Sequence, residues 1–193
     1  MEESYMPPKP KITKDMILHT VLEITREAGF EAVNARSIAT RLQCSTRPIF
    51  TCYENMEELK REFLAFAYAY YSRYVSDYGR TADVDSRFVL PLSYIEFARE
   101  ETCLFKLLFI SDMELDMKAA NDFYQEIGNV QRAEAFAEEI GVEQGEAKRI
   151  FLDLFLYSHG LAVLTATGKM ALEREETEKM LRHVLSALIG QKG

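Results

Sequence analysis

One short segment of the sequence places DNA-reading residue types at the expected start of a helix. Thr46 and Arg47 follow Ser45, a residue type that caps helices, and Ile49 and Tyr53 mark the apolar face behind them. An arginine can donate two hydrogen bonds to O6 and N7 of guanine, and the first turn of a recognition helix reaches base edges in the major groove. Thr46 and Arg47 are therefore candidates for base contacts. The alternative for Arg47 is an ordinary exposed surface charge.

The sequence contains no recognisable catalytic or metal-binding pattern. The motifs GxSxG and HExxH and the glycine-rich phosphate loops are absent, and the three histidines are scattered. The spacing of Cys44, Cys52 and Cys103 is not that of a zinc site. We therefore expect a protein that is not an enzyme and needs no metal or cofactor. Reduced thiols, the lack of a signal-peptide pattern and the lack of a membrane-spanning apolar run predict a cytoplasmic chain.

Aromatic side chains are concentrated after residue 62, with 8 of 10 tyrosines and 10 of 12 phenylalanines. We expect part of this set to line a pocket, because apolar walls with a few phenols and one imidazole suit a flat or lipophilic molecule with a polar end. The alternative for each ring is an ordinary core position, and a lone histidine is more often a core or interface residue than a ligand contact. The candidate ligand-binding residues are Tyr70, Tyr74, Tyr94, Phe97, Phe105, Phe109, Met113, Phe123 and His159.

Helices must position these residues, and the apolar spacing predicts where they lie. Residues 1–12, which are rich in proline, should form a mobile arm. Three helices should follow at 14–28, 35–42 and 46–53, the last two joined by a tight turn, and a long fourth helix should run over 56–79. The expected caps are Thr13, Asn34, Ser45 and Asn55 at the helix starts and Gly29 at the end of the first helix.

The remaining two-thirds of the chain also follows a helical pattern. We expect helices within 86–110 and at 123–140, 144–167 and 173–189, with an irregular link at 111–122. The last two helices carry apolar stripes, which include Leu161 and Leu185, too wide for one side of a small domain. Two such helices from each of two subunits would form a four-helix interface. The alternative is that they only cover the core of one subunit.

Composition and charge limit the class of protein. The chain has 193 residues, few glycines and prolines, and a net charge of −8. This composition predicts an all-α protein and excludes a wholly basic nucleic-acid coat protein, but it allows a DNA-binding segment beside an acidic domain. Residues 1–62 hold 9 basic and 10 acidic side chains, which is close to neutral for a DNA reader.

Residues 13–60 resemble the DNA-binding domain of the TetR/AcrR family of transcriptional repressors. The family order is an apolar helix ending in G-[FY], a capped second helix with Arg and I-A, then S-T-x-x-[LI]-[YF]-x-x-F and an Asn before the fourth helix. The matching residues here are Gly29-Phe30, Asn34, Arg36, Ile38-Ala39, Ser45-Thr46, Ile49-Phe50, Tyr53, Asn55 and Leu59. Residues 158–162, Ser-His-Gly-Leu-Ala, also look like a pattern common in the penultimate helix of such regulators.

The resemblance implies a three-helix helix-turn-helix domain over 13–60, followed by a helical effector-binding and dimerisation domain over 61–193. It also implies a homodimer on palindromic operator DNA and makes Arg36 a second candidate for base contact. Asn34, Ser45 and Lys60 are candidates for phosphate contact, and the alternative for Asn34 and Ser45 is that they are plain caps. Phe50 and Thr51 are expected to meet sugar or a thymine methyl group.

Several residues depart from the family pattern. Gln43 stands where glycine is usual in the turn, Phe50 lacks the hydroxyl of the usual tyrosine, and Cys52 replaces a stronger hydrogen-bond donor. Glu54 and Met56 flank Asn55 in place of basic residues. We therefore expect DNA binding that is modest and strongly salt-sensitive.

The expected function is that of a ligand-responsive transcriptional regulator, a repressor that an apolar or aromatic small molecule releases from its operator. The alternative is a helical small-molecule-binding or interaction protein with weak or lost DNA binding, which the near-neutral N-terminal segment favours.

Overall fold

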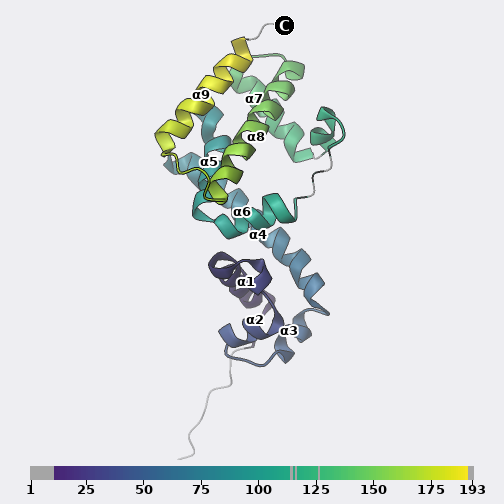
Figure 1. Ribbon diagram of the computed structural model, residues 1–193. Coiled ribbons are helices and arrows are strands. Elements are labelled where there is room, and N and C mark those ends of the chain that lie inside the picture. Colours follow the sequence, from purple (N-terminus) through teal and green to yellow (C-terminus); the bar gives the residue numbers. More distant parts are fainter. Residues whose placement is uncertain (1–10, 114, 116, 126, 191–193) are drawn as a thin grey trace, which may run out of the picture. The chain divides into compact units, whose positions relative to one another are not determined.

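The structure, a computed structural model, describes residues 11–190 apart from 114, 116 and 126 (Figure 1). Every regular element within those residues is a helix, so the predicted all-α class is confirmed. Most of the arm expected at 1–12 lies outside the described residues.

The chain divides into two compact units, of which the N-terminal one ends at Ala67 and the C-terminal one begins at Tyr68. The division falls inside the long helix α4 (Met56–Thr81), so this one helix contributes residues to both units.

The N-terminal unit consists of α1 (Lys14–Ala28), a 3₁₀ turn (Phe30–Ala32), α2 (Ala35–Arg41), α3 (Arg47–Cys52) and the first part of α4 (Figure 1). Apolar side chains from all four helices meet in one core, because each helix has a single stripe that must leave water. The fully buried apolar members are Ile17, Val21, Ile38, Ile49, Leu59, Phe63 and Ala67.

Local hydrogen bonds fix the helix ends much as the sequence predicts. The Thr13 side chain accepts from the N–H of Met16, and Gly29 ends α1 with a φ of 83°. Asn34 and Ser37 form a capping box, in which each side chain accepts from the other's backbone N–H. The Asn55 side chain accepts from the N–H of Glu58, so its predicted role as the cap of α4 is confirmed.

The expectation that Ser45 caps α3 is wrong. Thr46 occupies the N-cap position in a helical conformation, and its side chain makes no capping hydrogen bond. The Thr46 carbonyl instead accepts from the N–H groups of Ile49 and Phe50, which closes the first turn with backbone alone. Pro48 is consequently the second helical residue, where its missing N–H costs nothing.

The C-terminal unit contains the rest of α4 and the helices that follow it. These are α5 (Ser86–Glu100), α6 (Thr102–Lys106), a π-helical turn (Leu107–Ser111), a 3₁₀ turn (Ala120–Gln125), α7 (Ile127–Ile140), α8 (Gln144–Ala166) and α9 (Arg174–Gly190). Helix α8 lies among α5, α7 and α9 and contacts all three (Figure 1). The helix expected at 123–140 thus starts at Ile127, after a separate 3₁₀ turn.

Helix α8 is long and apolar enough to cross a membrane by length and composition. Its buried residues include Ile150, Leu154, Leu161 and Ala162, which face the neighbouring helices of the unit. Core helices of globular proteins have the same composition, so this feature is weak evidence for a membrane span.

Candidate functional site

A Schellman turn connects α2 to α3 and sets the direction in which α3 leaves. The N–H of Cys44 donates to the carbonyl of Ala39, and the N–H of Gln43 donates to the carbonyl of Thr40. This hydrogen-bond pattern requires a left-handed backbone conformation at position 43, and the φ of Gln43 is 51°. Gln43 is the one residue other than glycine with a positive φ among the residues that the structure describes.

Ionic contacts fasten α2 to α1. The Arg41 guanidinium donates to both carboxylate oxygens of Glu27, at 2.9 Å and 2.6 Å, and Glu23 lies 3.7 Å away. The hydrogen bond from Arg41 lowers the pKa of Glu27. Because this pair is surface-exposed, its role is to orient α2 more than to stabilise the unit.

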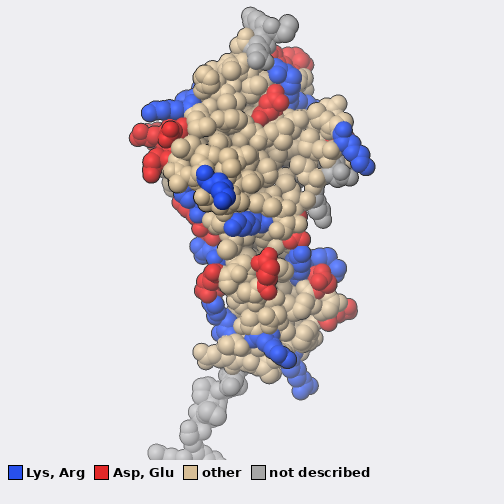
Figure 2. Space-filling view, viewed as in Figure 1, with Lys and Arg blue, Asp and Glu red and all other residues tan. Residues whose placement is uncertain are grey.

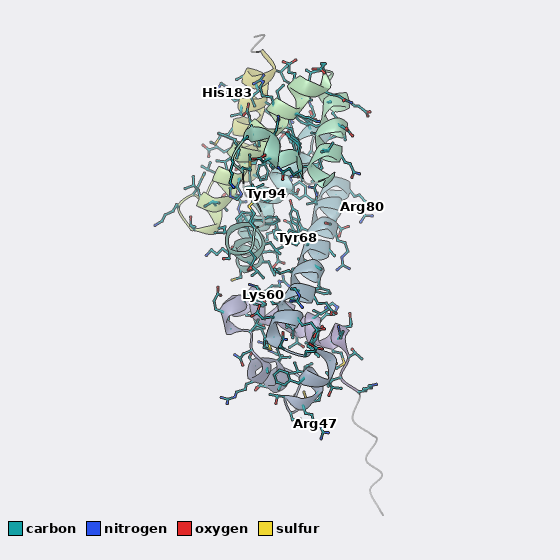
Figure 3. The ribbon with its side chains drawn as sticks, turned by 90° about the vertical axis from the view of Figure 1, so that its right-hand side faces the viewer. Arg47, Lys60, Tyr68, Arg80, Tyr94 and His183 are labelled. Carbon is teal, nitrogen blue, oxygen red and sulfur yellow. The ribbon has the colours of Figure 1, made fainter. Side chains whose placement is uncertain are left out.

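Most of the predicted DNA-contacting residues of α2 and α3 lie on the surface of the N-terminal unit. Exposed members are Asn34, Arg36, Ser45, Arg47, Phe50 and Thr51, and Thr46 is half-buried. Figure 3 shows Arg47 extending outward at one end of the N-terminal unit. Figure 2 shows basic side chains at that end of the unit.

Arg36 and Arg47 form no ion pair with any carboxylate in the described part of the chain. Their guanidinium donors therefore face water and can be offered to an external acceptor. By contrast, Arg41 is committed to Glu27 and Glu23. Arg36 and Arg47 are thus two exposed cations without an ion-pair partner in the described residues, one on α2 and one on α3.

Other predicted members of this surface already have local partners. The Asn34 side chain accepts from the N–H groups of Arg36 and Ser37, which confirms that it is a helix cap. The Thr51 hydroxyl donates to the Arg47 carbonyl at 3.0 Å, so its methyl group is its more available part.

Lys60 is not brought together with the arginines. Its ammonium lies 5.7 Å from the centre of the Phe30 ring, and Figure 3 shows Lys60 and Arg47 at opposite ends of the N-terminal unit. Its phosphate-contacting role stays a prediction.

The start of α4 is fastened to α1 and α3 around Tyr53. The Tyr53 ring is 2 % exposed, the Lys14 ammonium lies 4.5 Å from its centre, and Lys14 is ion-paired with Glu62. Burial, and next to it the nearby Glu62 carboxylate, raises the pKa of the Tyr53 phenol. Tyr53 is therefore a core residue that holds α3 against α4.

Most of the predicted ligand-binding residues form one aromatic cluster inside the C-terminal unit. Ring contacts join Tyr94, Phe97, Phe105, Phe109 and His159, and Phe123 is connected to Tyr94 through Phe155. Phe97 and Phe105 are fully buried, as core positions would be. Met113 is half-buried in the irregular segment.

A polar pair lies within this aromatic cluster. The Tyr94 hydroxyl and Nδ1 of His159 are 2.9 Å apart, and Tyr94 is 5 % exposed. Burial lowers the pKa of His159, which favours the neutral form of the imidazole, and in the tautomer with an unprotonated Nδ1 the ring can accept a hydrogen bond from the phenol. Figure 3 shows Tyr94 inside the C-terminal unit.

Tyr70 and Tyr74 link α4 to the end of α5. Their hydroxyls donate to the carboxylates of Glu101 and Glu100, each at 2.7 Å, and both rings contact Phe97. The two tyrosines are four residues apart, so they lie on the same face of α4. Both tyrosines therefore contact the C-terminal end of α5 through their rings and their hydroxyls.

The sequence reasoning missed several rings of this cluster, among them Tyr71 and Phe155. Tyr71 contacts Tyr94, Phe97 and Phe109, and Phe155 contacts His159. Phe155 could have been found, because it stands four residues before His159 on the same face of α8. Tyr71 could have been found in the same way, because it stands four residues after Ala67 and eight after Phe63, on the buried face of α4.

The outward side of α8 differs from the one expected for an interface. Leu161 and Leu185 are 6 % and 2 % exposed, so they belong to the core of the subunit. Leu156 and Leu164 are 50 % and 43 % exposed instead, and Gly160 lies midway between them. A methyl group added at Gly160 would meet no described atom within 4 Å beyond its chain neighbours and the backbone of its own helical turns.

The described residues contain no group of three or more histidine, cysteine, aspartate or glutamate side chains placed to hold a metal ion. Cys44, Cys52 and Cys103 are free thiols, each half-buried.

Comparison with models of protein families and with curated proteins finds no match for this chain.

Proposed function

We propose that this chain is a DNA-binding transcriptional regulator of the TetR/AcrR type, with α2 and α3 forming a helix-turn-helix. The observation that carries the proposal is that Arg36 on α2 and Arg47 on α3 are both exposed and that neither has a carboxylate partner in the described residues. Unpaired guanidinium groups on a fixed helical scaffold suit the guanine edges and phosphates of duplex DNA.

The local construction supports this proposal. Arg47 starts α3, so it stands where a recognition helix first meets base edges. The Schellman turn at Gln43 and the contacts of Arg41 with α1 fix the direction of α2 and α3 before any DNA is bound. A preorganised reader loses less entropy on binding than a flexible one.

We further propose that the regulator acts as a homodimer through the outward side of α8. Leu156 and Leu164 leave large apolar groups in water, and a second copy would bury them. Glycine inside a helix costs about 0.5–1 kcal/mol relative to alanine, and no contact with the described residues requires it at Gly160. Close approach of a second α8 would explain both features. Two-fold symmetry then matches two half-sites about 34–36 Å apart.

The aromatic cluster is the proposed region for a small-molecule effector. A phenol and a neutral imidazole, Tyr94 and His159, lie among apolar rings, which suits a largely apolar or aromatic molecule with one polar end. A bound molecule shifts the regulator only by its differential affinity for the two states, and a tenfold release from DNA needs about 1.4 kcal/mol.

The test is selection of duplex DNA from a randomised library by the full chain, followed by fluorescence anisotropy on the enriched duplex. Arg47→Ala should weaken binding by about 5- to 150-fold, the equivalent of roughly 1–3 kcal/mol, and relax preference at one base position per half-site.

Arg73→Ala is the matched control. Arg73 is an exposed arginine of α4 within the C-terminal unit, so its removal changes the net charge equally without touching α2 or α3. It should leave affinity within about twofold. Failure to enrich any sequence would contradict the proposal and favour the second candidate, a helical interaction protein without DNA binding, which the near-neutral residues 1–62 support.

A further inference from the structure

Phe50 is an exposed aromatic side chain on the same short helix as Arg47. It is 50 % exposed, whereas its neighbours Ile49 and Tyr53 are almost completely buried. It has no ring or cation contact with any residue in the described part of the chain. The core-facing side of α3 is therefore complete without Phe50, and the exposed ring is available to contact another molecule.

The chemistry of this ring narrows what it can meet on DNA. Phenylalanine has no hydrogen-bond donor or acceptor, so it cannot bind a phosphate oxygen or a polar base edge. The apolar group that base pairs present in the major groove is the 5-methyl group of thymine. The other partner expected from the sequence is the sugar, which is the same at every position, so only contact with the methyl group would let a phenyl ring distinguish base sequences.

We propose that Phe50 reads the methyl group of a thymine in each half-site, so that the chain selects duplexes by a thymine methyl as well as by a guanine. This inference rests on the proposed function, because it assumes that α3 enters the major groove.

The spacing on α3 places the thymine close to the guanine of Arg47. Three residues of α-helix rise by about 4.5 Å, and stacked base pairs are about 3.4 Å apart. The methyl group should therefore lie one or two base pairs from the guanine. Thr51 lies beside Arg47 on the same turn, with its hydroxyl bonded to the Arg47 carbonyl, so its methyl group is the competing reader.

The experiment replaces the thymines of the selected duplex by uracil, one at a time, which removes only the methyl group. Anisotropy with the unmodified chain should show one position per half-site where uracil lowers affinity by about fourfold, the effect of exposing one methyl group. With Phe50→Ala, that position should show no preference for thymine over uracil. Phe50→Leu keeps an apolar side chain and should keep part of the preference.

Three results would overturn the inference. The first is an unmodified chain that binds the duplex but is indifferent to uracil at every position. The second is a thymine preference that persists in Phe50→Ala, and the third is one that disappears in Thr51→Ser, which would assign the reading to Thr51. All three leave DNA binding intact, so they are distinct from failure of the proposed function, which would appear as no enriched sequence. Because Phe50 is half-exposed, the melting temperature of Phe50→Ala should be close to that of the unmodified chain.

Discussion

Replacing Gln43 by glycine should stabilise the N-terminal unit. Gln43 is the left-handed residue of the Schellman turn between α2 and α3, with a φ of 51°. Its side chain is exposed and makes no hydrogen bond with the described residues, so Gln43→Gly removes no contact. The substitution tests only the backbone conformation at this position.

The magnitude follows from two opposing terms. A residue with a Cβ atom pays about 1–2 kcal/mol to be left-handed, a cost that glycine avoids. Glycine also gains freedom in the unfolded chain, which offsets about 0.4–1 kcal/mol of that benefit. The midpoints of these two ranges leave a net gain of about 0.8 kcal/mol in the free energy of unfolding. For a unit of this size, that is about 3–6 °C in melting temperature.

The assay is thermal unfolding of the full chain followed by far-UV circular dichroism. Hydrogen exchange of the backbone amides in α2 and α3 assigns the change to the N-terminal unit, because α8 amides should exchange as before. Gln43→Ala is the control, since it shortens the side chain but keeps the Cβ atom and hence the backbone cost. It should leave the melting temperature within about 2 °C.

A Gln43→Gly variant that is no more stable than Gln43→Ala would refute the reasoning. That outcome would mean that the positive φ carries no cost in this turn, or that the unfolded-state entropy of glycine cancels the whole benefit.

Three further predictions concern the C-terminal unit. Leu164→Glu should convert a homodimer into monomers by placing a charge in the proposed interface, and a monomeric unmodified chain in sedimentation velocity would contradict this. Tyr94→Phe should lower the free energy of unfolding, measured by urea titration, by about 1–3 kcal/mol, because Nδ1 of His159 loses its buried partner. The control Tyr74→Phe, at a half-exposed tyrosine, should lose less than about 1 kcal/mol, and equal losses in the two variants would contradict the prediction. Hydrogen bonds from Arg87 lower the pKa of Asp85 to about 2, so the contribution of Asp85 to stability is present above its unfolded-state pKa near 4 and is lost as the pH falls toward 2. Between about pH 5 and pH 3 the melting temperature of Asp85→Asn should therefore fall less than that of the unmodified chain, and parallel melting curves would contradict this assignment.

The sequence by itself determined the helical class and most helix ends. Thr13, Asn34 and Asn55 act as caps because each needs only a backbone N–H two or three residues away. Gly29 ends α1 for an equally local reason, its tolerance of a positive φ. Such features can be read from neighbouring residues, since the interactions that produce them span less than one helical turn.

Only the tertiary structure decided which side of an apolar helix is the core. Leu161 and Leu164 are three residues apart on α8, yet one is buried and the other is 43 % exposed. The difference depends on where α5, α7 and α9 lie against α8, which periodicity does not specify when a helix is apolar on most sides.

Long-range packing also decided the surroundings of the candidate functional residues. The sequence marked Lys60 as a surface cation near DNA, but its ammonium lies over the Phe30 ring, thirty positions away in the chain. Tyr94 and His159 are joined by a hydrogen bond across a separation of 65 residues. Contacts of this kind form when helices from distant parts of the chain bury their apolar faces together, so no local sequence pattern predicts them.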